Sequence, residues 1–282
     1  MRVRWLVALA LVVGLTACGD PPDSRSVTEE SRAKVPFDGD LAGKRGAERA
    51  LECSGDVYRT GVGDPEGGLE ENGDSPGLGL DHWLDPQGYL HQVPETGYAV
   101  ETEDGDRVLI SYDNESDETV IAFAMRDGQT DYYQDGEGWM VESYAMCDPA
   151  DWPQDVTDGL DIGVWQDESG TSVPVTTVVS FHGPEHCGWQ ESTWIWLGED
   201  GADGEFIGNP TRDLRDGLQT TYELDVPVPA DARDTGWSHD GNRLLIAEDG
   251  SAAYLVSTVA DADRTVGDRW PAAKKLGSIR CA

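Results

Sequence analysis

Residues 98–112 read YAVETEDGDRVLISY, and this stretch decides the fold that the sequence predicts. Strand-forming residues run from Tyr98 to Glu103 and again from Arg107 to Tyr112. Asp104-Gly105 between them is a hairpin turn signal, because glycine readily takes the positive φ angles that tight hairpin turns need. The stretch therefore predicts two antiparallel strands.

The second half of the chain repeats this pattern. Residues 240–246 read DGNRLLI and match DGDRVLI at residues 104–110. Earlier in each half, Ser75-Pro76 corresponds to Asn209-Pro210, and each pair has the form of an N-cap residue followed by proline at the start of a helix. Because the matches keep the same order in both halves, we interpret them as an internal duplication.

The cysteines follow the same duplication. Cys53 and Cys147 are 94 residues apart, and so are Cys187 and Cys281. Apart from Cys18, the chain has four cysteines, and an even number in an exported chain indicates disulfides. We therefore predict the pairs Cys53–Cys147 and Cys187–Cys281, each stabilising its repeat by up to ~4.7 kcal/mol in the chain-entropy view of a loop of about 95 residues.

Together these patterns predict an α+β fold, mainly antiparallel β, in two tandem repeats. Each repeat is expected to be a short helix on a small antiparallel sheet, closed by its disulfide. Further strands are expected at 119–125, 139–146 and 252–259, with a hairpin of 161–166 and 172–181 between the repeats. The predicted parts are a signal peptide at 1–17, a disordered tether at 18–48, and repeats at 49–155 and 156–282.

The first residues read as an export signal with a lipid attachment site. Arg2 and Arg4 precede an apolar run, and Leu15-Thr16-Ala17-Cys18 matches the lipobox of bacterial lipoproteins. The uncharged run from Trp5 to Ala17 is shorter than the roughly 20 residues that span a bilayer as a helix. We expect cleavage before Cys18, a lipid on that cysteine, and the body of the protein outside the cell membrane.

The net charge restricts the partners. The chain has 55 acidic and 20 basic residues, and residues 1–17 hold two of the basic ones and no acid, so the remainder carries a formal charge of −37. This argues against nucleic acid and against electrostatic docking on anionic lipid. The acids are spread along the chain, which favours adaptation to a salty exterior over the alternative, a cation-binding function.

Cysteine-centred motifs resemble a group of uncharacterised actinomycete secreted lipoproteins. The motifs are GPEHCGWQ at 183–190, Gly138-Trp139 with CDPA at 147–150, and Trp270-Pro271 with the ending Cys281-Ala282. The resemblance covers most of the chain after residue 17. It implies surface localisation and a two-part disulfide fold, and it carries no activity or cofactor.

Two groups of residues are candidate ligand sites. His182, Glu185, His186 and Cys187 could bind zinc, but Cys187 is more simply half of a disulfide and Pro184 breaks the helix that the two histidines would need. Trp194 and Trp196 would share a face of a strand and, with Trp189 and His186, could form either core or a platform for carbohydrate. The acidic loop at 199–205 does not have the spacing of a twelve-residue calcium loop.

No motif for catalysis is present. Gly-x-Ser-x-Gly and His-Glu-x-x-His do not occur, and the five histidines form no recognisable triad. The leading hypothesis is a non-catalytic, lipid-anchored binding or structural module that meets a protein or a glycan of the envelope, with no cofactor. The alternative is an envelope glycan hydrolase that uses paired carboxylates. The sequence leaves the oligomeric state open.

Overall fold

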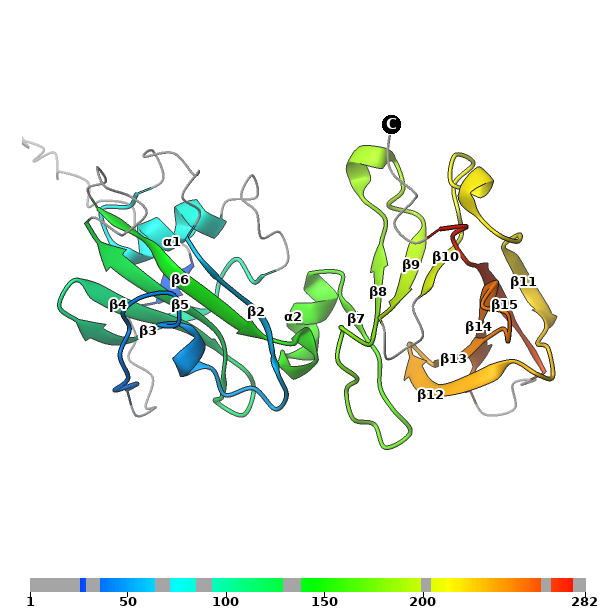
Figure 1. Cartoon of the computed structure of the whole chain (residues 1–282), viewed down its shortest axis with the longest axis horizontal. Helices are drawn as coiled ribbons and strands as arrows, with labels where there is room; N and C mark the ends of the chain where they lie inside the picture. Colours follow the sequence, from blue (N-terminus) through cyan, green and yellow to red (C-terminus); the bar gives the residue numbers. More distant parts are fainter. Residues whose placement is uncertain are drawn as a thin grey trace, which may run out of the picture.

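A computed structural model describes residues 26–28, 36–63, 72–84, 93–128, 138–198, 204–259 and 265–275. These residues form two lobes that follow each other along the chain and meet at the short helix α2 (Figure 1). The first lobe contains one sheet, and the second contains two.

The first lobe is a six-stranded sheet with one helix. Its elements are β1 (Val27–Thr28), η1 (Glu48–Ala50), β2 (Val57–Val62), α1 (Pro76–Leu84), β3 (Tyr98–Asp104), β4 (Arg107–Asp113), β5 (Thr119–Asp127) and β6 (Trp139–Cys147). The strand order is β1-β3-β4-β5-β6-β2, and only the pair β1–β3 is parallel. The predicted hairpin is β3–β4, with Asp104 paired to Arg107 and the turn at Gly105-Asp106.

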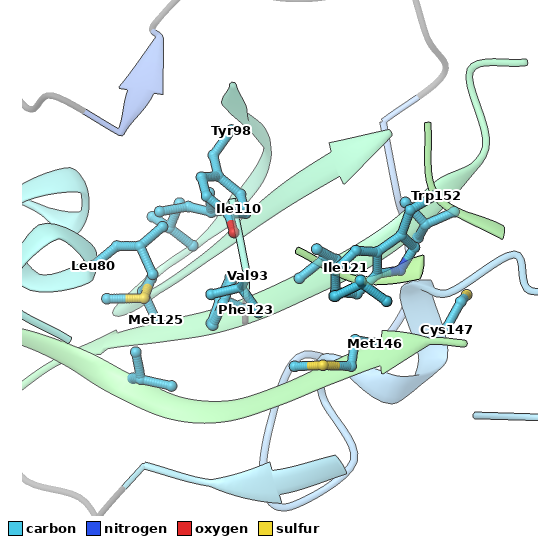
Figure 2. Packing of buried hydrophobic residues seen from close by; sticks show 14 of the residues in the cluster. Leu80, Val93, Tyr98, Ile110, Ile121, Phe123, Met125, Met146, Cys147 and Trp152 are labelled. Atoms are coloured by element: carbon cyan, nitrogen blue, oxygen red, sulfur yellow. The ribbon is translucent and has the colours of Figure 1, made fainter. Parts of the chain in front are cut away.

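The main core of this lobe lies between the sheet and α1 (Figure 2). Leu80 of α1 is fully buried and lies beside Met125 of β5 (Figure 2). The ring of Phe123 makes T-shaped, edge-to-face contacts with Trp83 and Tyr98, with ring centroids 5.1 and 5.6 Å apart. Burial of such large side chains supplies most of the stability of a sheet–helix layer.

The other face of the sheet is covered by residues 36–51. Leu41 and Ala47 are buried there against the small residues Ala122, Ala124 and Ala145. The prediction of a disordered tether is wrong for residues 36–48. The small side chains on this face of the sheet let the segment pack closely, so that its few apolar residues are buried. Residues 18–25 and 29–35 of the predicted tether lie outside the described part.

The second lobe begins after a short connection. The connection is made of η3 (Pro149–Asp151) and α2 (Gln154–Gly159). The lobe contains β7 (Gly163–Val164), β8 (Val178–His182), η4 (Glu185–Cys187), β9 (Thr193–Leu197), β10 (Gly204–Gly208), η6 (Arg215–Gly217), β11 (Glu223–Pro227), β12 (Arg233–His239), β13 (Asn242–Ile246), β14 (Ala252–Ser257) and β15 (Val266–Pro271).

Two antiparallel sheets enclose the core of the second lobe. Their strand orders are β10-β9-β8-β7 and β11-β15-β14-β13-β12. Isolated bridges join the sheets at both sides, Phe206 with Ala272 and Gln166 with Ser238. The core between the sheets is built from Trp165, Val173, Val178, Ile195, Leu197, Phe206, Leu244, Ile246, Ala253 and Ala272.

The structure contradicts the predicted pair of tandem repeats. The described residues are mainly antiparallel β, as expected, but they form three sheets rather than one in each half. Asn209 has a positive φ of 44° and stands in a turn, and only the 3-10 turn η6 follows where the second helix was predicted. An N-cap residue needs extended backbone, so Asn209-Pro210 is a turn signal and not a helix start.

The hairpins that suggested the duplication also differ in detail. In the second lobe His239 pairs with Asn242, so the turn is Asp240-Gly241, and both residues have positive φ. In the first lobe the turn residues are Gly105 and Asp106, so the matching pair Asp104-Gly105 begins one residue before the turn. The matched sequences are therefore two local hairpins in differently built lobes.

Within the described residues, one complete disulfide is present. Cys53 is bonded to Cys147, the pair predicted for the first half. Cys187 also takes part in a disulfide. Its predicted partner Cys281 lies outside the described residues, so the pair Cys187–Cys281 remains a prediction. The described residues therefore do not contain a second repeat closed by its own disulfide. In the part of the chain that the structure covers, no helix is both long and apolar enough to cross a bilayer.

Candidate functional site

The connection between the lobes is held by a buried carboxylate. Asp148 is 7% exposed, and its Oδ1 accepts hydrogen bonds from the backbone N–H groups of Ala150 and Val175, both at 2.9 Å. The first bond caps η3, and the second reaches the segment that leads into β8. Burial raises the pKa of Asp148, and the backbone hydrogen bonds oppose this rise.

Apolar contacts continue through this joint. Trp152, Ile162 and Val175 belong to the same buried cluster as the core of the first lobe. Figure 2 places Trp152 beside Ile121, at the end of the core away from Leu80. Because a shared core resists bending, α2 is held in place against the second lobe.

Two cavities lie where α2 faces the second lobe. The first, which we call the helix cavity, has a volume of about 320 Å³ and lies between α2, the start of the second lobe and the turn from β12 to β13. The second, the strand cavity, has a volume of about 370 Å³ and extends from α2 across β7, β8 and β9 to β14 and β15. Asp158, His239 and Asp240 line both cavities, so the two adjoin, and we refer to them together as the cleft.

The turn after β12 is fixed by several backbone contacts. The backbone of Ser238 exchanges two hydrogen bonds with Gln166, at 2.8 and 2.9 Å. Thr258 donates from both its N–H and its hydroxyl to the carbonyl of Gly241. These contacts set the place of Asp240 at the mouth of the cleft.

His239 has a defined hydrogen-bonding state. Its Nδ1 lies 3.0 Å from the carbonyl oxygen of Val164. A carbonyl only accepts, so Nδ1 carries the hydrogen of this contact, and Nε2 on the other side of the ring lies 3.6 Å from Oδ2 of Asp240. A Cβ on Gly163 would stand 3.0 Å from this Nε2 and 2.0 Å from the Oγ of Ser180, so only glycine allows the ring and Ser180 to approach this closely.

Asp161 links α2 to β8. Its carboxylate accepts a hydrogen bond from the backbone N–H of His182 at 2.6 Å and also contacts Nδ1 of the same residue. Asp161 has a φ of 58°, a conformation that aspartate tolerates better than most residues. His182 is therefore bound to the carboxylate of Asp161 and lines the strand cavity. The side chain of His186 lies outside the described part of the chain.

The predicted aromatic platform is placed mostly in the interior. Trp189 and Trp194 are 7% and 4% exposed and stack with their ring centroids 6.0 Å apart, over Ile207, Leu214 and Leu218. Trp196 of β9 is partly exposed. The sequence allowed either a core or a ligand platform for these residues, and Trp189 and Trp194 belong to the core. Other aromatic residues, Trp165, Phe181 and Trp270, line the strand cavity.

The cleft does not assemble a metal centre from the described side chains. Among them, one group of three has ligand atoms within 4.8 Å of one another, namely Cys53, Cys147 and Asp151. The two cysteines are bonded to each other and offer no thiolate.

Reasoning from sequence missed the cleft residues Asp158 and His239. They come from α2 and from the end of β12, more than eighty residues apart, and no local pattern connects them. The signals near the site were the Asp240-Gly241 turn and the candidate ligand His182, which lines the strand cavity. Comparisons with protein-family models, with curated proteins and with solved structures found no match to this chain.

Proposed function

We propose that the chain is a lipid-anchored extracytoplasmic protein that binds a small ligand, without catalysis, in the cleft between α2 and the second lobe. The observation that carries this proposal is the pair of adjoining cavities that share Asp158, His239 and Asp240. Ligand sites are concave and combine apolar walls with a few polar groups. The cleft likewise combines apolar and polar side chains, and the lipobox at Cys18 supports an anchor on the outer face of the cell membrane.

Native mass spectrometry of the mature protein tests the binding role. The protein is incubated with a small-molecule extract of the envelope and compared with Thr193→Trp, which fills the strand cavity. We expect a bound species on the wild type and none on this variant. Thr176→Trp, at an exposed position that does not line the cleft, is the control and should retain the ligand. Equal retention by Thr193→Trp, with its unfolding midpoint preserved, contradicts the proposal.

Cys18→Ser tests the anchor separately. The wild type is expected in the membrane fraction and to incorporate a labelled fatty acid. The variant lacks the acylated thiol and should be unlabelled. A variant that still carries the label would place the lipid elsewhere and contradict attachment at Cys18.

A glycan hydrolase remains a second candidate because of one observation. Asp158 from α2 and Asp240 from the β12–β13 turn line the same cleft together with tryptophan side chains. Paired carboxylates across a cleft are the usual machinery of glycoside hydrolysis. Release of reducing sugar from envelope glycan by the wild type, lost in both Asp158→Asn and Asp240→Asn, would favour this candidate over a binding role.

A further inference from the structure

One serine that lines the strand cavity has a hydroxyl without a protein partner. Ser180 of β8 is 7% exposed, and among the described residues its side chain makes no hydrogen bond. Most polar side chains that are buried to this extent are paired, and a chemical role is one of the recognised reasons for an exception. The groups around Ser180 therefore decide what its hydroxyl can do.

The ring of His239 and the hydroxyl of Ser180 lie over the same glycine. Gly163 of β7 is the residue paired with Ser180 across the two strands. A Cβ on Gly163 would stand 2.0 Å from Oγ of Ser180 and 3.0 Å from Nε2 of His239, so these two atoms are at most about 5 Å apart, the sum of the two distances. Contacts between a nucleophile and its base are often loose in a protein without its ligand and tighten when the ligand binds.

The His239 ring is held in place by its other contacts. Nδ1 lies 3.0 Å from the carbonyl oxygen of Val164, and the ring packs on Trp165 with ring centroids 5.5 Å apart. Because this carbonyl keeps a hydrogen on Nδ1, the nitrogen toward Ser180 is the one that takes up a proton when the ring is neutral. Oδ2 of Asp240 lies 3.6 Å from the same nitrogen and favours the charged ring that results, although solvent screens this attraction because the Asp240 side chain is 84% exposed.

A hydroxyl, a base and a group that orients the base are the parts of a nucleophilic serine. A histidine takes the hydroxyl proton as the oxygen attacks a carbonyl carbon, and an acceptor on the other ring nitrogen holds the ring in place. Ser180, His239 and the carbonyl of Val164 stand in these relations, although they come from β8, β12 and β7. The strand cavity also has apolar residues that suit the apolar part of an ester, namely Ile195, Leu255 and Trp270.

We propose that Ser180 is a nucleophile that accepts the acyl group of an ester, with His239 as its base. Oγ of Ser180 forms a bond to the carbonyl carbon of the ester, and the bond from that carbon to the alcohol oxygen breaks. The proton of Ser180 passes to Nε2 of His239 and then to the leaving alcohol, so the products are an acyl ester on Ser180 and a free alcohol. This goes beyond the proposed function, because the cleft then holds part of its ligand covalently, once per molecule and without turnover.

The activated ester p-nitrophenyl butyrate tests the nucleophile. It is mixed with the mature lipidated protein in detergent, intact-mass spectrometry follows the butyryl adduct, and absorbance follows the released p-nitrophenolate. We expect one butyryl group per protein, located on Ser180 by peptide mapping, and one equivalent of p-nitrophenolate. Ser180→Ala should form no adduct. Ser116→Ala, at an exposed serine of the first lobe that does not line the cleft, is the control and should react like the wild type.

Two further substitutions test the base and the geometry. In His239→Gln the side chain can still donate to the carbonyl of Val164 but cannot take up a proton, so we expect the adduct to form at least a hundredfold more slowly. Gly163→Ala changes neither group, but its Cβ displaces Oγ of Ser180 and should slow the reaction at least tenfold. Gly159→Ala, where a Cβ has open space, is the matched control and should keep the wild-type rate. Rates are compared for variants that keep their unfolding midpoint.

The outcomes separate this inference from the binding role. An adduct that persists in Ser180→Ala, a wild-type rate in His239→Gln, or no adduct on the wild type overturns the inference. The extract experiment still decides on binding in each of these cases, because it does not depend on an ester. If the wild type releases several equivalents of p-nitrophenolate and Ser180→Ala releases none, Ser180 is the nucleophile and only the non-catalytic part of the proposed function is wrong.

Discussion

The carboxylate of Asp148 accepts a hydrogen bond from the backbone N–H of Val175, 27 residues further along the chain, and this bond crosses from the first lobe to the second. The same Oδ1 caps the 3-10 turn that begins the connection. One buried oxygen therefore sets both the direction of the connection and the position of the segment that leads into β8. Since α2 follows directly, the shape of the cleft depends on this contact.

Removal of the Asp148 carboxylate should loosen the joint. In Asp148→Ala the backbone donors of Ala150 and Val175 lose their acceptor, so we expect the free energy of unfolding to fall by about 2–3 kcal/mol. Urea denaturation measures the change. Asp148→Asn keeps an acceptor oxygen and should lose less; an equal loss in both variants would show that the acceptor is not what matters.

The titration of Asp148 makes the free energy of unfolding depend on pH, and the direction of the raised pKa fixes the sign of this dependence. Burial raises the pKa of Asp148 in the folded protein above the ordinary aspartate value of 3.8, so the folded state holds this proton more tightly than the unfolded state does. Its contribution to stability is therefore greatest below pH 3.8 and is lost as the pH rises through the folded pKa.

Asp148→Asn cannot titrate, and it isolates this contribution. Relative to this variant, the wild type should lose unfolding free energy as the pH is raised from below 4 and reach a plateau above the folded pKa. Urea titrations at a series of pH values measure the difference. A difference that stays constant with pH would contradict the assignment of the shift to this residue.

Gly79 on α1 is needed for close packing. A Cβ at this position would lie 2.4 Å from the carbonyl oxygen of Trp139 on β6. Alanine favours a helix over glycine by about 1 kcal/mol, but the clash with backbone forces α1 off the sheet and should cost about 1–3 kcal/mol. We expect Gly79→Ala to lower the thermal midpoint.

Gly159, the last residue of α2, is the matched control for that substitution. Nothing lies within 4 Å of a Cβ placed there, so Gly159→Ala should leave stability unchanged or raise it by up to about 1 kcal/mol. Stabilisation by both substitutions would show that α1 does not approach β6 as closely as described.

The Cys53–Cys147 disulfide should contribute strongly to the stability of the first lobe. It closes a segment with a sequence separation of 94, for which the chain-entropy view gives about 4.7 kcal/mol. We expect the double variant Cys53→Ala/Cys147→Ala to lose up to this amount in guanidinium denaturation. The single variants Cys53→Ala and Cys147→Ala remove the same bond, and each should lose at least as much unfolding free energy as the double variant. A double variant as stable as the wild type would mean that the bond does not constrain the unfolded chain.

The sequence by itself determined the local parts of this protein. The hairpin at 98–112, its counterpart with the turn at Asp240-Gly241, and the strands at 119–125 and 139–146 follow from local patterns. These patterns are short runs of strand-forming residues and turns that need positive φ, which are properties of neighbouring residues. The equal cysteine spacing also predicted the bond between Cys53 and Cys147.

Tertiary structure alone decided how these parts combine. The second half became two sheets because β9 pairs with β8 and β10, while β11 takes the place beside β15; similar hairpins do not specify such long-range pairing. The cleft likewise joins Asp158, Ser180 and His239 from three separate elements. Their proximity results from the packing of α2 against the second lobe, which depends on the buried bond between Asp148 and Val175 and not on any pattern along the chain.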